Sequence, residues 1–82
     1  MRHLSNDEFY HYITANCKRM IYLANPPRNL AFRSQDNAEG TSMKVWGKLS
    51  GGKEYELSYD DEDFTEAFMY KEVLTKEEYD NY

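Results

Sequence analysis

The sequence predicts an α+β fold: a three-stranded antiparallel β-meander with one helix before it and two after it, in the order αβββαα. Residues 5–24 carry apolar side chains at helical spacing. Residues 29–59 form three runs of alternating apolar and polar residues, and residues 60–82 contain two helix-start signals. The 82 residues allow one domain, 1–82, in which we expect the helices to pack on one face of the sheet.

The first helix is expected to begin after Ser5 and to end before the proline pair Pro26-Pro27. Ser5 and Glu8 have the spacing of a capping box, in which each residue satisfies a backbone N–H group of the other. Proline cannot continue a helix, so the pair marks its end. The expected apolar stripe is Phe9, Ile13, Cys17, Met20, Ile21 and Ala24.

Three strands are expected over residues 29–35, 42–49 and 53–59. The register of the second hairpin decides which way Trp46 points. A two-residue loop would pair Trp46 with Leu57, whereas a three-residue loop pairs Val45 with Tyr59. We favour the three-residue loop because it puts both apolar rows on one face, and a slip of one residue would bury lysines. Trp46 then lies on the opposite face.

Two helices are expected to close the fold. Asp60 is the expected N-cap of the first, and Thr75 with Glu78 forms a capping box for a short second one. Together the elements predict one core, made by the residues on the apolar face of each element: Phe9, Ile13, Met20, Ile21, Leu30, Phe32, Met43, Val45, Leu49, Tyr55, Leu57, Phe64 and Phe68.

The charges are distributed unevenly around a net charge of −5. Residues 54–82 hold eleven Asp/Glu and two Lys, whereas residues 1–53 hold four acids and eight bases. A negative surface attracts basic partners through its field. The single cysteine, the lack of an apolar run of about 20 residues and an N-terminus without an apolar signal core favour a cytoplasmic protein without membrane segments.

No motif for catalysis, cofactor binding or metal binding is present, so we predict a non-enzymatic protein with no cofactor and no metal. The two histidines, His3 and His11, have no nucleophile signature around them, and a calcium loop starting at Asp61 would need glycine where Glu66 stands. The αβββα order is also that of double-stranded-RNA-binding domains. The acidic second helix would repel phosphates, however, so we expect no direct nucleic-acid contact.

The acidic surface has three interpretations. It is a solvated face, or a mimic of nucleic acid, or part of an adaptor or antitoxin-like module that binds through Trp46 and tyrosines without mimicry. Carboxylates along a helix approximate part of a phosphate row, because a helix rises about 1.5 Å per residue and duplex DNA carries one charge per roughly 1.7 Å. We favour the mimic, with a basic nucleic-acid-binding protein as partner. The expected contact residues are Asp36, Glu39, Trp46, Glu54, Glu56, Asp60, Asp61, Glu62, Asp63, Glu66 and Tyr70.

The element order, the acidity and the segment Gly52-Lys53-Glu54-Tyr55-Glu56-Leu57-Ser58, which leads into an acidic helix start, resemble phage-encoded anti-CRISPR proteins of the small Cas9-inhibitor type. The resemblance implies a counter-defence protein that blocks a host nuclease or CRISPR effector in the host cytoplasm. It also implies that the acids at 60–63 engage arginines that normally read DNA. The turn 36–40, which contains Asp36 and Glu39, would be a second contact loop.

Overall fold

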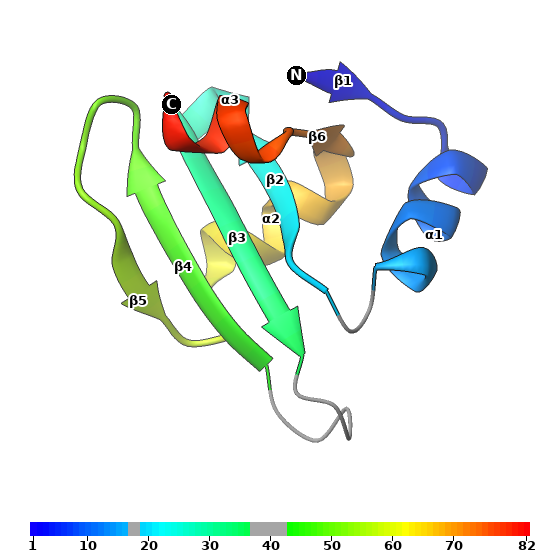
Figure 1. Cartoon of the computed structure of the whole chain (residues 1–82), viewed down its shortest axis with the longest axis horizontal. Helices are drawn as coiled ribbons and strands as arrows, with labels where there is room; N and C mark the ends of the chain where they lie inside the picture. Colours follow the sequence, from blue (N-terminus) through cyan, green and yellow to red (C-terminus); the bar gives the residue numbers. More distant parts are fainter. Residues whose placement is uncertain (17–18, 37–42) are drawn as a thin grey trace.

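The computed structural model describes residues 1–16, 19–36 and 43–82 and has an α+β fold built on a six-stranded antiparallel sheet (Figure 1). The strand order is β1-β6-β2-β3-β4-β5. The elements along the chain are β1 (Arg2–His3), α1 (Asn6–Ala15), β2 (Ile21–Asn25), the 3₁₀ turn η1 (Pro26–Arg28), β3 (Leu30–Asp36), β4 (Met43–Leu49), β5 (Tyr55–Leu57), α2 (Glu62–Tyr70), β6 (Glu72–Val73) and α3 (Lys76–Asp80).

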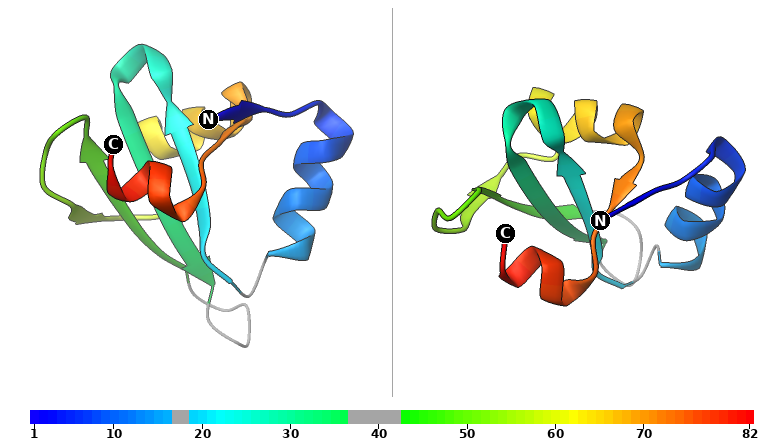
Figure 2. Two further views of the ribbon diagram at one scale, coloured as in Figure 1. Left: turned by 45° about the horizontal axis from the view of Figure 1, so that its top comes forward. Right: turned by 90° about the horizontal axis from the view of Figure 1, so that it is seen from above.

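Helices cover both faces of this sheet, so the expected packing on one face is wrong. Figure 2 shows α2 and α3 on opposite sides of the strands. On the α2 side, Phe9 of α1 and Phe64 of α2 join Phe32 of β3 in the larger core. On the α3 side, Ala24, Ala31, Leu74 and Tyr79 form a second, smaller core. The single predicted core is therefore two cores, separated by the sheet.

The first helix is half as long as expected. Ser5 forms its predicted capping box with Glu8, but the helix ends at Ala15, and Ile21–Asn25 is the strand β2. Because β2 lies inside the sheet and is buried on both faces, it presents a nearly continuous apolar run. Such a run cannot be distinguished from a buried helix segment by its period alone. Cys17, which was expected in the apolar stripe, lies outside the described residues.

The strands β3 and β4 lie where the alternation predicted them, but the register of the β4–β5 hairpin differs. Val45 pairs with Leu57 and Trp46 with Glu56, and the loop between the strands is five residues long, 50–54. The predicted pairing of Val45 with Tyr59 is wrong by two residues. A shift of two residues keeps every side chain on its face, and Trp46 therefore lies on the predicted side, away from Leu57.

The C-terminal part contains two helices, as predicted, and a strand between them that was not. Asp61, and not Asp60, caps α2 by accepting a hydrogen bond from the Phe64 N–H group. Thr75 forms the predicted capping box of α3. The strands β1 and β6 have two residues each. That length is too short for a period, so only their partners in the sheet define them.

Two residues of the predicted core are exposed instead. Leu49 is 55% exposed and Tyr55 is 42% exposed. Both lie on the α2 side of the sheet, because Leu49 shares its face with Val45, and Tyr55 shares its face with Leu57. Leu4, Leu23 and Val73, which were not in the predicted core, are buried in it. The helix α2 covers the middle of the sheet and leaves the Leu49–Tyr55 corner open.

Candidate functional site

The sheet divides the predicted contact residues into two groups. Asp60, Asp61, Glu62, Asp63, Glu66 and Tyr70 lie at or on α2. Glu54, Glu56 and Trp46 lie on the α3 side, where Glu56 faces Trp46 across the β4–β5 ladder. The backbone of Asp36 ends β3, and its side chain lies outside the described residues, as does all of Glu39. The predicted site is therefore two separate regions of the surface.

The acids at the start of α2 are placed by the helix itself. Asp61 is the N-cap, and Glu62 and Asp63 occupy the first turn. The free N–H groups and the dipole at this end favour negative charge, which explains why acids gather there. The side chains of Asp60 and Glu62 are exposed, so these two carboxylates are the most accessible to a partner.

A shallow hollow of about 480 Å³ runs over this end of α2. Four carboxylates line it, those of Asp60, Glu62, Asp63 and Glu66. The guanidinium of Arg28 and the side chains of Thr65 and Met69 complete the lining. The Arg28 Nε atom lies 3.6 Å from Asp63 Oδ1, with the Arg28 side chain 63% exposed and the Asp63 side chain 39% exposed. The hollow therefore carries a formal charge of −3.

A buried asparagine fixes the far end of this hollow. Asn25 is fully buried, and its Nδ2 group donates to the Asp63 carbonyl at 3.0 Å and to Glu66 Oε1 at 3.3 Å. Both partners are acceptors, so the amide nitrogen must face them. The same Glu66 oxygen accepts from the Tyr70 hydroxyl at 3.3 Å. Glu66 and Tyr70 are thus held in place by β2, and Asn25 Oδ1 has no partner among the described residues.

The group on the α3 side is an internal network. Arg33 donates from Nε and Nη2 to the two oxygens of Glu54, each at 2.6 Å, and its Cζ atom lies 3.9 Å from the centroid of the Trp46 ring. The Tyr79 hydroxyl donates to Glu54 Oε2 at 2.7 Å. The hydrogen bonds from Arg33 lower the pKa of Glu54, while burial followed by the bond to Glu54 raises the pKa of Tyr79.

Glu54 and Trp46, both expected as contact residues, belong to this network. The Glu54 charge is compensated by Arg33, and Trp46 is half-buried beneath the guanidinium. Neither residue belongs to the acidic surface on α2. The alternation of strand residues placed Arg33 and Trp46 on one face, but only the pairing of β3 with β4 brings them opposite each other.

Three cations of the N-terminal part of the chain contact acceptors elsewhere in the molecule. Arg28 faces Asp63, and Arg33 binds Glu54. Lys48 Nζ donates to the Tyr79 carbonyl at 3.1 Å and to the Asp80 carbonyl at 3.3 Å, at the C-terminal end of α3. A cation at this position satisfies carbonyls that have no partner within the helix. These cations are therefore committed to structural contacts.

Exposed apolar side chains beside the acids were missed by the sequence analysis. Tyr59 is 66% exposed and Met69 is 74% exposed, and both flank the α2 acids or lie among them. Burial, followed by the charges of Asp61 and Asp63, raises the pKa of the Tyr55 phenol. The positions of these residues, at the end of a predicted strand and on the outer side of a predicted helix, could have indicated their exposure. The expected single core instead placed Tyr55 in the interior.

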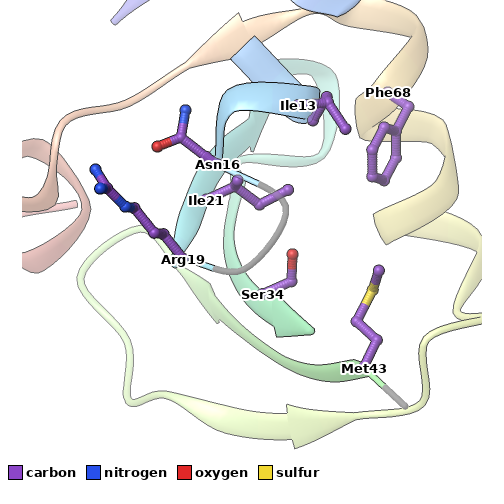
Figure 3. Close-up of a pocket in the computed structure, with 7 residues that line it drawn as sticks. All are labelled: Ile13, Asn16, Arg19, Ile21, Ser34, Met43 and Phe68. Atoms are coloured by element: carbon purple, nitrogen blue, oxygen red, sulfur yellow. The ribbon is translucent and has the colours of Figure 1, made fainter. Parts of the chain in front are cut away.

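A cavity beneath α1 is small. It has a volume of about 60 Å³ and lies between α1, the sheet and Phe68 (Figure 3). Ser34 and Met43 contribute to its lining, and Arg19 extends away from it. Pockets for drug-sized ligands measure about 300–1,000 Å³. This cavity is a packing gap beneath α1 and offers no room for such a ligand.

Comparisons with protein-family models, curated proteins and solved structures find no match to this chain. Within the described ranges, no group of three or more His, Cys, Asp or Glu residues is arranged to hold a metal ion. No helix in the same ranges has the length and apolar character needed to cross a bilayer. The fold and the surface define a small α+β domain with an acidic hollow on α2, next to exposed tyrosine and methionine side chains.

Proposed function

We propose that this chain is a small acidic inhibitor that binds a nucleic-acid-handling protein, such as a CRISPR effector or another host DNA enzyme, and occupies its phosphate-binding surface. The supporting observation is the hollow on α2, which is lined by Asp60, Glu62, Asp63 and Glu66 together with one arginine. These carboxylates take the place of phosphates, and the partner's lysines and arginines bind them. The proposed partner is therefore a basic protein and not a nucleic acid.

The spacing of the helix acids suits this role. Glu62 and Glu66 are one helical turn apart, which is about 6 Å along the axis. Two phosphate steps on one DNA strand cover about 6.8 Å. Asn25 and Tyr70 hold Glu66 on one side of the row, so part of the charge pattern is preorganised. Preorganised groups lose less conformational freedom on binding than free side chains do.

The test compares two double variants with equal charge. Asp60→Asn with Glu62→Gln removes two exposed acids from the proposed surface but leaves the cap Asp61 in place. Asp7→Asn with Glu77→Gln removes two exposed acids from the first turns of α1 and α3. Both proteins have a formal charge of −3, two units above the −5 of the parent. Glu62, Asp7 and Glu77 each lie in the first turn of a helix, where an acid contributes about 0.3–1 kcal/mol through the helix dipole.

The measurement is inhibition of DNA binding and cleavage across a panel of purified CRISPR effectors and other DNA nucleases. We expect the parent and the α1/α3 variant to inhibit the same enzyme, and the α2 variant to lose inhibition while remaining folded by circular dichroism. Equal inhibition by both variants would contradict the proposal. No inhibition of any panel member by the parent chain would contradict it as well.

A second function, an adaptor or antitoxin-like module without mimicry, is favoured by the exposed Tyr55, Tyr59 and Met69 beside the acids. Tyrosine and methionine are enriched at protein interfaces. Salt separates the two functions, because screening weakens contacts between exposed charges but not apolar burial. A mimic loses affinity for its target steeply between low and high salt, whereas an adaptor keeps its affinity.

A further inference from the structure

The strand β5 forms one edge of the sheet. In the strand order of the described residues, β5 is terminal and pairs with β4 alone. An edge strand presents N–H and C=O groups that another chain can pair with. Which residue of β5 presents these groups follows from the ladder pattern.

The hydrogen-bond alternation of the antiparallel ladder identifies that residue. The Ser50 N–H group donates to the Asn29 carbonyl, next to the end of the β3–β4 pair. In an antiparallel pair, hydrogen-bonded and non-hydrogen-bonded residue pairs alternate. Counting from Ser50 in steps of two, the backbone groups of Trp46 are directed towards β3. Val45 and Gly47 therefore direct their backbone groups towards β5, where they face Leu57 and Tyr55. It follows that the N–H and C=O groups of Glu56 point outward, away from β4.

The side chains around this edge specify the chemistry of a strand that pairs with it. Residues directly opposite each other in a ladder lie on the same face, and opposite charges there are favourable. A residue opposite Glu56 would lie beside its exposed carboxylate, which favours lysine or arginine. Its two neighbours would lie on the other face, next to Tyr55 and Leu57, which favours apolar residues.

We infer that the open edge of β5 accepts an extended segment of a protein partner, with a basic residue opposite Glu56 and an apolar residue on each side of it. This inference rests on the proposed function, because it assigns part of the contact with the basic partner to the backbone of β5. Only one residue of the strand directs its backbone groups outward, so the edge contact is short. The carboxylates on α2 supply the rest of the interface.

A second copy of this chain is a poor occupant of the same edge. Antiparallel pairing of two β5 strands centred on Glu56 places two Glu56 carboxylates opposite each other. A shift by two residues places opposite Glu56 either Glu54, whose charge Arg33 compensates, or Ser58. Like charges directly opposite in a ladder destabilise it. The charge at the edge therefore disfavours self-pairing in the register centred on Glu56 and favours a basic partner strand.

Proline at position 56 tests the backbone contact directly. Glu56→Pro removes the outward N–H group, and proline is tolerated on an edge strand where this group faces solvent. Glu56→Ala is the matched control, since it removes the same carboxylate but keeps the N–H group. The probe is a short synthetic peptide with a valine–arginine–valine motif flanked by threonines, titrated into labelled protein and followed by NMR. A peptide with glutamate in place of the arginine is its control.

We expect the glutamate peptide to bind more weakly than the valine–arginine–valine peptide, and the latter to shift the Glu56 amide resonance and slow its exchange with solvent. Glu56→Ala should weaken binding by up to about fivefold, the value of one cross-strand charge pair. Glu56→Pro should weaken it further, by about tenfold relative to the alanine variant, through the lost hydrogen bond. If the proline variant unfolds, slower exchange of the Glu56 amide in the parent protein still reports whether its N–H group pairs with the peptide.

Three results would overturn the inference: equal affinity of the proline and alanine variants, unchanged exchange at Glu56 in the parent, or a dimer of the free chain that Glu56→Pro dissociates. The last result would identify a second copy as the occupant. The peptide does not depend on the α2 acids for its register, so Asp60→Asn with Glu62→Gln should still bind it at Glu56. Failure of the inhibition assay and failure of this titration are therefore separate outcomes.

Discussion

At the scale of single residues, Glu54 shows how a charge that looks available in the sequence is used internally. Its two oxygens accept from Arg33, and one also accepts from Tyr79. The guanidinium in turn lies on Trp46. One carboxylate thereby connects β3, the β4–β5 loop and α3, so its loss would affect folding before it affected binding.

Replacing Glu54 with Gln should destabilise the fold by about 1–2 kcal/mol at neutral pH, below the full value of charged hydrogen bonds because the pair is partly solvated. The effect should depend on pH. The pKa of Glu54 is lowered from the reference value of 4.5, so its contribution is present above that value. It is lost as the pH falls through the lower pKa of the folded state.

Urea unfolding of the parent and of Glu54→Gln from pH 7 to pH 2 measures how the free energy of unfolding of each protein depends on pH. The two stabilities should converge towards acid pH. The control, Glu77→Gln, replaces an exposed acid of α3 and should not reproduce the convergence. A difference between parent and Glu54→Gln that stayed constant down to pH 2 would show that the charge of Glu54 is not what stabilises the contact.

At the scale of elements, α2 connects the acidic surface to the sheet. Its buried side is Phe64 and Ala67, and the Phe64 ring lies 5.5 Å from Phe32 in an edge-on arrangement. Phe68 lies on the same side of the helix, with its ring centroid 5.1 Å from that of Phe64 and 5.9 Å from that of Phe9 in α1. The orientation of the acids on the outer side of α2 therefore depends on three aromatic contacts on its inner side.

Truncating Phe64 to Ala should cost about 3–5 kcal/mol, because it leaves a cavity between α2 and the sheet. Phe68→Ala should cost less, nearer 2 kcal/mol, since that side chain is only partly buried. Met69→Ala, on the exposed side of the same helix, is the control and should be nearly neutral. Thermal melts of the three variants give the order, and an unchanged midpoint for Phe64→Ala would mean that α2 does not pack on the sheet.

At the scale of the whole molecule, the two cores share the central strands. Leu23 and Phe32 point into the larger core, and Ala24 and Ala31 of the same strands point into the smaller one. Because β2 and β3 cannot unfold on one face alone, the two cores should be lost together. The acidic surface on α2 and the Arg33–Glu54 network on the other side therefore depend on the same folding transition.

A cooperative transition predicts that probes on the two faces coincide. Trp46 fluorescence reports the α3 side, and far-ultraviolet circular dichroism reports the helices and strands together. Leu74→Ala in the smaller core and Phe64→Ala in the larger core should each shift both signals to one new midpoint. Separate midpoints, with Trp46 changing first in Leu74→Ala, would show instead that α3 unfolds on its own.

The sequence by itself determined the elements whose signals are local. The capping boxes at Ser5 and Thr75 and the alternation that gives β3 and β4 depend on near neighbours in the chain. The accumulation of acids around Asp61 is also local, because a helix N-terminus attracts them. These features could be predicted because a capping box or a period needs only a few consecutive residues.

Only the tertiary structure decided the features that depend on distant partners. The strand β2 has an apolar run that fits a helix equally well, and its burial between β3 and β6 makes it a strand. The hairpin register, the exposure of Tyr55 and the pairing of Glu54 with Arg33 likewise depend on which segments meet in space. Residues 21 apart in sequence form that ion pair, and no local pattern encodes it. The sequence therefore determined where acids occur, and the fold determined which of them face outward.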